Sequence, residues 1–297
     1  TQLESELKVL NDEWVASDDG QRETVTEADV ANVVSIMSGI PVQRISESES
    51  YVLKNLGDRL KSVVVAQDDA IGKIVRSIQR NRLGLKDPNR PIGVFMFLGS
   101  TGVGKTYLAQ TLAELMFGTK DALIRIDMSE YSEKFNTSRL VGAPPGYVGY
   151  GEGGQLTEKV RRHPYSIVLL DEVEKAHGDV FNLLLQVLDE GRMTDGNGRM
   201  VDFRNTIIIM TSNTGTRQLV DFGNGIGFNA ALLDNSSEKA KEYARSVIQK
   251  SLAHQFAPEF LNRLDEIITF DQLDNTAIRK IVDIELSRLF KRINDMG

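Results

Sequence analysis

Gly99-Ser100-Thr101-Gly102-Val103-Gly104-Lys105-Thr106 is the stretch that decides the fold of this chain. It has the spacing G-x-x-x-x-G-K-[ST], and it follows an apolar run, Val94 to Leu98, that is typical of a buried strand. A helical pattern with apolar residues on one face comes directly after it. Strand, glycine loop and helix in this order predict a phosphate-binding loop, because backbone amides and a helix N-terminus hold phosphate oxygens. The alternative is a glycine-rich turn that binds nothing, and the complete match disfavours it.

The residues of this loop predict the ligand as well as the fold. Lys105 can reach the β- and γ-phosphates of a nucleotide, and the hydroxyl of Thr106 can bind Mg²⁺. We therefore expect a nucleoside triphosphate and Mg²⁺ at this loop. The other nucleotide contacts that we predict are Thr101, Gly102, Val103, Gly104 and Tyr107.

A second apolar run, Ser166 to Leu170, ends in the carboxylate pair Asp171-Glu172. Two acids at the tip of a buried strand form the Walker B pattern of nucleotide hydrolases. In this interpretation Asp171 holds the metal shell, and Glu172 orients and polarises the attacking water. The alternative is that the two acids only begin the next helix. The presence of a phosphate loop in the same chain favours the Walker B interpretation.

A third apolar run, residues 206–211, is followed by Ser212 and Asn213. If this strand lies beside the one that ends in Asp171, Asn213 can bond the γ-phosphate or the attacking water. The alternative is that Asn213 caps a loop, as asparagine often does.

Composition narrows the class of protein. The 297 residues include 35 basic and 42 acidic side chains, a net charge of −7, which disfavours a nucleic-acid face or a polybasic membrane anchor. Cysteine is absent, and no signal peptide or apolar run of membrane-spanning length is found, so we expect a cytoplasmic protein. The chain starts with a threonine and stops inside a helical pattern, so we interpret it as a piece of a longer protein.

Further elements follow from periodicity and turn residues. Val63 to Gln67 is either an apolar turn that could face an adenine ring or a short core strand. The polar stretch from Asp234 to Lys241 is expected to be mobile. One further helix is predicted to begin at an N-cap at Thr26. The other predicted helices are Leu3–Trp14, Leu53–Leu60, Asp69–Leu83, Val180–Leu188, Tyr243–Phe256 and Asn275–Lys291. We also predict strands at Leu123–Asp127 and Glu266–Phe270 and a hairpin at Arg192–Asp202.

Two loops carry exposed apolar residues. The first, Gly142 to Tyr150, places two tyrosines between glycines and prolines, where they either grip another molecule or fold back on their own domain. The second, Phe222 to Phe228, alternates glycine with apolar residues and reads as a flexible segment.

Taken together, these motifs resemble those of an AAA+ ATPase. Residues 142–150, the segment Asp171 to His177, and Phe260-Leu261-Asn262-Arg263 make the chain similar to the second ATPase domain of the Clp and heat-shock unfoldases. The resemblance covers nearly all of residues 26–297. It implies an α/β fold with a five-stranded parallel sheet flanked by helices in residues 51–271. It also implies the end of a coiled insertion and a linker in residues 1–50, and a truncated helical lid in residues 272–297 that stops before the sensor-2 arginine.

The resemblance also implies roles for individual residues. Lys105 and Thr106 correspond to the Walker A contacts with ATP and Mg²⁺, and Val64 and Val65 correspond to the adenine contacts. Asp171 and Glu172 correspond to the Walker B pair, and Asn213 corresponds to sensor 1. Arg263 corresponds to the arginine finger, which enters the neighbouring subunit's site. Tyr147 and Val148 correspond to the pore loop that grips a threaded polypeptide. The tripeptide Ile226-Gly227-Phe228 is similar to the loop by which ClpC, ClpA and ClpX dock on the ClpP peptidase, and favours a ClpC-like over a ClpB-like protein.

The function implied is an ATP-driven unfoldase and translocase. By resemblance it would act as a homo-hexamer on unfolded polypeptides, feed ClpP, and accept adaptor proteins. The alternatives are a ClpB-type disaggregase without a peptidase partner, a ring that binds nucleotide for assembly, and a nucleic-acid motor, which the charge disfavours.

Two positions depart from the family pattern. Ala66 replaces a glycine that is usual before Gln67, and Ser100 replaces a proline in the phosphate loop. Neither change removes a contacting group, but an alanine at position 66 is strained if the backbone there requires a positive φ.

Overall fold

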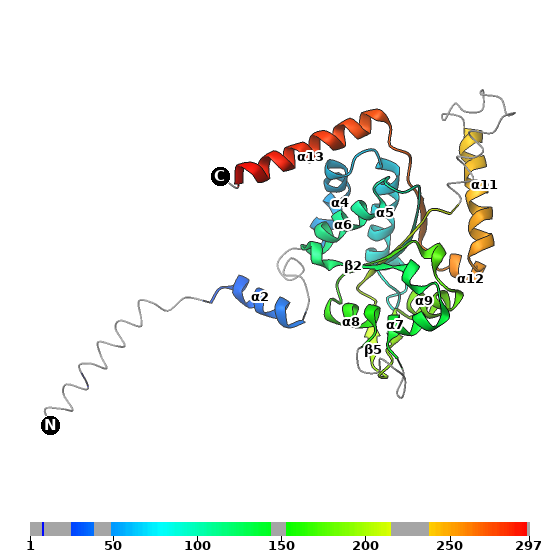
Figure 1. The fold of residues 1–297 in the computed structure, drawn as a ribbon. Coiled ribbons are helices and arrows are strands. Elements are labelled where there is room, and N and C mark those ends of the chain that lie inside the picture. Colours follow the sequence, from blue (N-terminus) through cyan, green and yellow to red (C-terminus); the bar gives the residue numbers. More distant parts are fainter. Residues whose placement is uncertain (1–7, 9–24, 39–48, 144–152, 215–237, 296–297) are drawn as a thin grey trace. The chain divides into compact units, whose positions relative to one another are not determined.

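A computed structural model describes residues 8, 25–38, 49–143, 153–214 and 238–295 of the chain (Figure 1). The chain divides into two compact units, Thr1–Ser46 and Glu47–Gly297. The predicted helix at Leu3–Trp14 lies outside the described residues, apart from Lys8.

The described part of the first unit is the helix α2 (Glu27–Ser38). Its start confirms the predicted N-cap. The Thr26 Oγ1 accepts a hydrogen bond from the Asp29 amide at 3.3 Å, and the Asp29 carboxylate accepts one from the Thr26 amide at 2.9 Å. In this reciprocal arrangement Thr26 and Asp29 each accept the amide of the other through a side-chain oxygen, as in a capping box.

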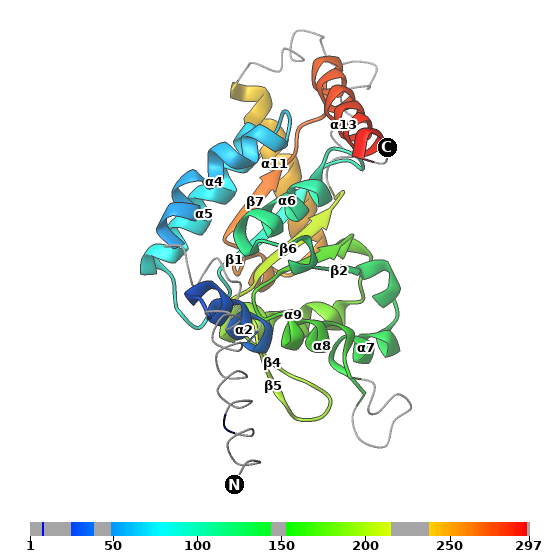
Figure 2. The same ribbon diagram turned by 90° about the vertical axis from the view of Figure 1, so that its left-hand side faces the viewer.

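The second unit is built on a five-stranded parallel sheet, as expected, with the strand order β2-β3-β6-β1-β7 (Figure 2). The strands are β1 (Gly93–Leu98), β2 (Leu123–Asp127), β3 (Ile167–Asp171), β6 (Ile207–Ser212) and β7 (Glu266–Thr269). Parallel strands need crossover helices, which cover both faces and so explain the continuous apolar runs in the sequence. A separate antiparallel hairpin, β4 (Arg192–Thr194) and β5 (Met200–Asp202), confirms the predicted one.

Helices cover the sheet on both faces (Figures 1 and 2). On one face lie α4 (Glu49–Val63), α5 (Asp68–Arg80) and α6 (Lys105–Phe117), and on the other α8 (Gln155–Arg162), α9 (Gly178–Glu190), α11 (Glu238–Gln255) and α12 (Pro258–Leu261). The remaining elements are α7 (Ser138–Val141), α13 (Asn275–Asp295) and the short helical turns η1 (Asn81–Leu85), η2 (Lys120–Ala122), η3 (Met128–Tyr131), η4 (Lys134–Thr137) and η5 (Val173–Lys175).

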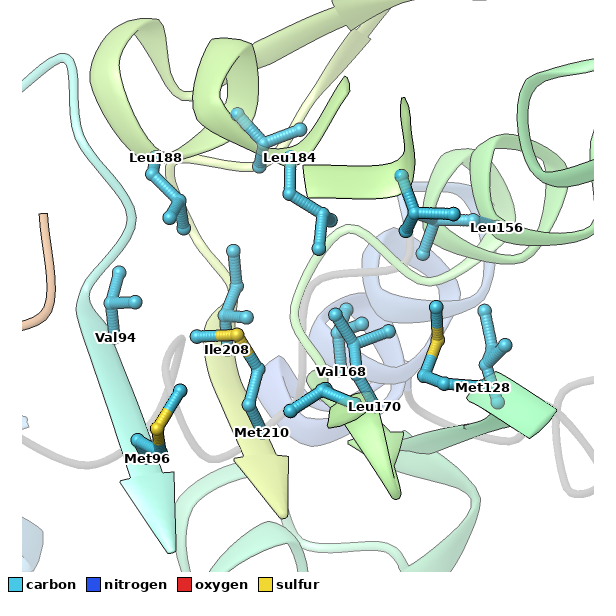
Figure 3. Close-up of a cluster of buried hydrophobic side chains, with 14 of the residues drawn as sticks. Val94, Met96, Met128, Leu156, Val168, Leu170, Leu184, Leu188, Ile208 and Met210 are labelled. Carbon is cyan, nitrogen blue, oxygen red and sulfur yellow. The ribbon is translucent and has the colours of Figure 1, made fainter. Parts of the chain in front are cut away.

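Strand alternation divides the core into two layers. Val94, Met96 and Leu98 belong to the layer under α8 and α9, whereas Phe95 and Phe97 belong to the layer under α4, α5 and α6. Figure 3 shows the first layer, in which β1, β6 and β3 each present apolar side chains toward leucines of α8 and α9. Because both faces are packed, the loops at the strand ends are held in fixed positions, and these loops carry the predicted site.

Two predicted elements differ from those observed. Val63 ends α4 and the next four residues form a turn, so the short core strand was the wrong alternative. The helix α11 begins at Glu238, five residues before its predicted start, so part of the stretch expected to be mobile is helical. Alternating lysine, alanine and glutamate are good helix formers, and this propensity outweighs the lack of an apolar pattern.

Ala66 lies in the turn between α4 and α5 with a φ of +60°. The backbone at Ala66 is therefore strained, because a left-handed conformation is unfavourable for a residue with a Cβ. A glycine, which is usual at this position in the family, would adopt it without strain.

We expect Ala66→Gly to raise the free energy of unfolding by about 0.5–1 kcal/mol, since relief of the strain exceeds the extra entropy that glycine loses on folding. Urea denaturation would measure the shift in midpoint at constant slope. The matched control is Ala253→Gly on the exposed side of α11, which should lose about 1 kcal/mol. Equal losses in both variants would contradict a strained turn at position 66.

Candidate functional site

The phosphate loop lies between β1 and α6 and is open in front of its glycines. Gly102 and Gly104 have φ values of +87° and +97°, and α6 begins at Lys105. A side-chain carbon built on either glycine would meet no other atom within 4 Å. The loop therefore combines a backbone that favours glycine with free space beside its amides, which is the arrangement that fits phosphate oxygens.

Lys105 is held in place by the loop itself. Its Nζ donates hydrogen bonds to the carbonyl oxygens of Gly99 at 2.7 Å and Ser100 at 2.8 Å. An ammonium group has three donors, so one remains for a phosphate oxygen. Burial lowers the pKa of Lys105, and the carboxylates of the Asp171–Glu174 segment, chiefly Asp171, oppose this shift. These charges act on Lys105 because the end of β3 and the phosphate loop share one edge of the sheet.

The remaining loop residues differ in exposure. Thr101 is exposed, and Thr106 and Tyr107 are half-buried in the first turn of α6. The side chain of Val103 is 6% exposed and packs beneath the loop next to Gly99, so a nucleotide could meet its backbone but not its side chain.

Asp171 ends β3 and is held from both neighbouring strands. One carboxylate oxygen accepts a hydrogen bond from the hydroxyl of Thr211 on β6. The other accepts two from the guanidinium of Arg125 on β2, at 2.6 Å and 3.1 Å. With 14% of its side chain exposed, Asp171 is a partly buried anion whose charge Arg125 balances.

Glu172 follows in an unusual backbone conformation. Its φ is +56°, and its amide donates a hydrogen bond to the Thr211 hydroxyl at 3.0 Å. Its carboxylate forms an ion pair with Lys175 at 2.5 Å, which raises the pKa of that lysine. To act on a water molecule, the Glu172 carboxylate would have to leave Lys175.

Asn213 lies just beyond the end of β6, at the same edge of the sheet as Asp171. Its amide donates to the carboxylate of Glu174 at 3.3 Å. Gln255 of α11 donates to the Glu174 carbonyl at 3.2 Å, so α11 also supports this corner. The structure thus brings the predicted phosphate loop, Walker B pair and sensor 1 residue together.

The predicted adenine turn is tied to the phosphate loop by Gln67. The Gln67 amide group donates to the Asp271 carbonyl at 3.0 Å and to the Val103 carbonyl at 3.4 Å, and accepts from the Asp271 amide at 3.3 Å. Val64 is buried and Val65 is half-buried, so Val65 has the side chain that a base could contact. The turn, the phosphate loop and the chain after β7 are therefore linked through one buried side chain.

Arg263 lies at the opposite end of the sheet. Two residues later, the Asp265 amide donates to the carbonyl of Val94 at 2.8 Å, near the start of β1, whereas the phosphate loop follows the end of β1. A strand rises about 3.3 Å per residue, so the two ends are separated by about 16 Å. The Arg263 guanidinium pairs with Asp189 of α9. It therefore takes no part in the phosphate site of its own chain.

Residues 90–267 match the protein family described as AAA domain (Cdc48 subfamily). The chain belongs to this family. It is also 51% identical over 297 residues to the ATP-dependent Clp protease ATP-binding subunit ClpC of Staphylococcus aureus, and 51% identical over 295 residues to the protein of the same description in Staphylococcus saprophyticus. These alignments cover 100% and 99% of the chain but 36% and 35% of the relatives, so the chain spans about a third of their length. The resemblance to an AAA+ domain of the ClpC type is confirmed.

The predicted pore-loop residues of this AAA domain, Tyr147 and Val148, and the predicted docking residues, Ile226, Gly227 and Phe228, lie outside the described residues. Within the described ranges, no helix is both long and apolar enough to span a membrane. The same part of the chain holds no cluster of three or more side chains of the His, Cys, Asp or Glu type that could form a metal site. Mg²⁺ is commonly held by one or two carboxylates together with substrate phosphates, so Asp171 and Thr106 fit this ion.

Sequence reasoning missed three side chains of this AAA domain that hold the site together, namely Arg125, Thr211 and Gln67. A signal was present for two of them. Arg125 is a charged residue within an apolar strand, and Thr211 is a hydroxyl at the end of one. Neither pattern shows which residue of another strand the side chain meets.

Proposed function

We propose that this chain is the second ATPase module of a hexameric Clp-type chaperone that hydrolyses ATP to unfold and thread polypeptides. The observation that supports this most directly is the position of Lys105 among the charges of Asp171, Glu174 and Glu172 at one edge of the sheet. Its relatives of 51% identity, described as ATP-binding subunits of an ATP-dependent protease, point to the same activity.

The chemistry of the site is phosphoryl transfer to water. Mg²⁺, bound by Thr106 and Asp171, would neutralise charge on the phosphate oxygens. The third N–H of the Lys105 ammonium group would donate a hydrogen bond to a phosphate oxygen while the other two hold the loop. Glu172 orients and polarises the attacking water after leaving Lys175, and Asn213 positions the water or the γ-phosphate.

Arg263 would act on the neighbouring subunit. It lies about 16 Å along the sheet from the phosphate loop of its own chain. A hexamer would bring it to the next site, where an arginine stabilises the charge that develops on the transferred phosphate. A monomer is then expected to hydrolyse ATP slowly.

The proposed partners follow from the two loops that the sequence indicates at residues 142–150 and 222–228. Tyr147 and Val148 would grip unfolded polypeptide in a central pore, because an aromatic ring contacts many sequences with little preference. Ile226, Gly227 and Phe228 would dock on the ClpP peptidase. Adaptor proteins and a cytoplasmic location accompany this proposal.

The proposal is tested by phosphate release from ATP in the full-length protein, with and without Mg²⁺, together with unfolding of a fluorescent substrate that carries a disordered tail. We expect hydrolysis that depends on Mg²⁺ and unfolding that depends on hydrolysis. Tight ATP binding by an assembled ring without phosphate release would favour an assembly platform instead. Stimulation by DNA at low salt would favour a nucleic-acid motor, and unfolding without any association with ClpP would favour a ClpB-type disaggregase.

A further inference from the structure

Thr211 places a buried hydroxyl in the strand β6, directly after four apolar residues. The preceding positions of β6, Ile207 to Met210, are isoleucines and a methionine, and all are buried. Thr211 itself is 1% exposed. A valine has nearly the same shape and suits a buried strand at least as well, so packing alone gives no reason for a hydroxyl here.

The hydroxyl of Thr211 bridges two consecutive residues of the neighbouring strand end. It donates a hydrogen bond to the Asp171 carboxylate and accepts one from the Glu172 amide at 3.0 Å. A hydroxyl has one proton to donate, and this one is directed to the carboxylate that would hold the metal. One of the two lone pairs of the same oxygen accepts the backbone N–H of Glu172, the residue that would activate water.

The second of these bonds matters because Glu172 has a left-handed backbone. A φ of +56° is unfavourable for a residue with a side chain and persists when surrounding contacts hold it. The bond from the Glu172 amide to Thr211 fixes the start of this turn, and a bond from the Lys175 amide to the Glu172 carbonyl at 3.0 Å fixes its other side. The direction in which the Glu172 carboxylate leaves the backbone is set by these two contacts.

We propose that Thr211 is a positioning residue, which aligns the metal-binding carboxylate of Asp171 and the water-activating carboxylate of Glu172 through one hydroxyl. This inference rests on the proposed function. It assigns Thr211 no contact with the nucleotide, so its effect falls on metal binding and on the hydrolytic step. Arg125 occupies the second oxygen of Asp171 and cannot replace Thr211, because it makes no bond to Glu172.

The test compares Thr211→Val with Thr211→Ser in a full-length protein whose other ATPase ring is inactivated, so that the rate reports this site alone. Thr211→Val keeps the shape and removes the hydroxyl, and we expect kcat to fall about 10- to 100-fold, the usual effect of removing a partner that orients a metal ligand. The Mg²⁺ concentration at half-maximal rate should rise. ATP affinity measured in EDTA should stay unchanged, and Thr211→Ser should restore kcat to within about threefold of the original. If Thr211→Val does not fold, Thr211→Ala removes the same hydroxyl without adding volume and carries the same expectation.

A second measurement does not depend on turnover. Hydrogen exchange of the Glu172 amide in the nucleotide-free protein should be faster in Thr211→Val than in Thr211→Ser, because this amide loses its acceptor. Equal kcat and equal Glu172 exchange in Thr211→Val, Thr211→Ser and the original protein would overturn the inference. If Glu172→Gln abolishes hydrolysis while the Thr211 variants do not differ, the inference fails and the proposed function stands. If Glu172→Gln leaves hydrolysis unchanged, the proposed function fails.

Discussion

Glu172→Gln is expected to lower ATP hydrolysis at least about 100-fold in a full-length protein whose other ATPase ring is inactivated, while ATP stays bound. Glutamine keeps the shape of the side chain but carries no negative charge to polarise a water molecule, and general-base catalysis of this kind contributes about 10²–10⁴-fold. The phosphate loop and Lys105 are unchanged, so ground-state binding is retained. The lost ion pair with Lys175 is half-exposed, so solvent screens it and its loss changes stability little.

The measurements for this variant are phosphate release at saturating ATP and retention of a labelled nucleotide on the protein. Polypeptide substrate should be trapped, since it is engaged without being released. The matched control is Glu190→Gln, which removes an exposed carboxylate at the end of α9 and should leave the rate unchanged. A normal rate in Glu172→Gln would contradict the role given to Glu172.

Arg263→Ala is expected to lower ATP hydrolysis about 1,000-fold or more in the assembled protein with its other ATPase ring inactivated, with little change in nucleotide affinity. An arginine finger contributes about 10³–10⁵ to the rate of related reactions, and Arg263 lies too far from its own phosphate loop to assist binding there. The ion pair with Asp189 is more than one-third exposed on both sides, so its loss costs about 1 kcal/mol at most and does not unfold the chain.

Mixing two inactive variants shows whether Arg263 acts on a neighbour. In a ring formed from Arg263→Ala and Glu172→Gln subunits, some sites combine an intact Glu172 with an intact Arg263 from the next subunit, so part of the activity should return. If Arg263 acts within its own chain, the mixture stays inactive, because no subunit has both residues. The control Arg279→Ala changes an exposed arginine of α13 and should leave the rate unchanged, which separates the effect from a general loss of positive charge.

Local sequence determined most of the fold. Four- to six-residue apolar runs identified the strands that carry the site, since a parallel sheet buried on both faces needs continuous apolar strands. The phosphate loop is likewise a local feature, because its glycine conformations, its lysine and the helix that follows are contiguous. For the same reason the N-cap at Thr26 and the hairpin at Arg192–Asp202 were predicted correctly.

Contacts between strands were decided by the tertiary structure. Thr211, Arg125 and Asp171 are far apart in the chain, and they meet because β3 lies between β2 and β6 in the sheet. The position of Arg263, at the end of the sheet opposite the phosphate loop, likewise depends on how the strand β7 pairs with β1. Sequence patterns indicate which side chains can do chemistry, but strand order and register determine which of them lie within hydrogen-bonding distance, because these depend on packing across the whole core.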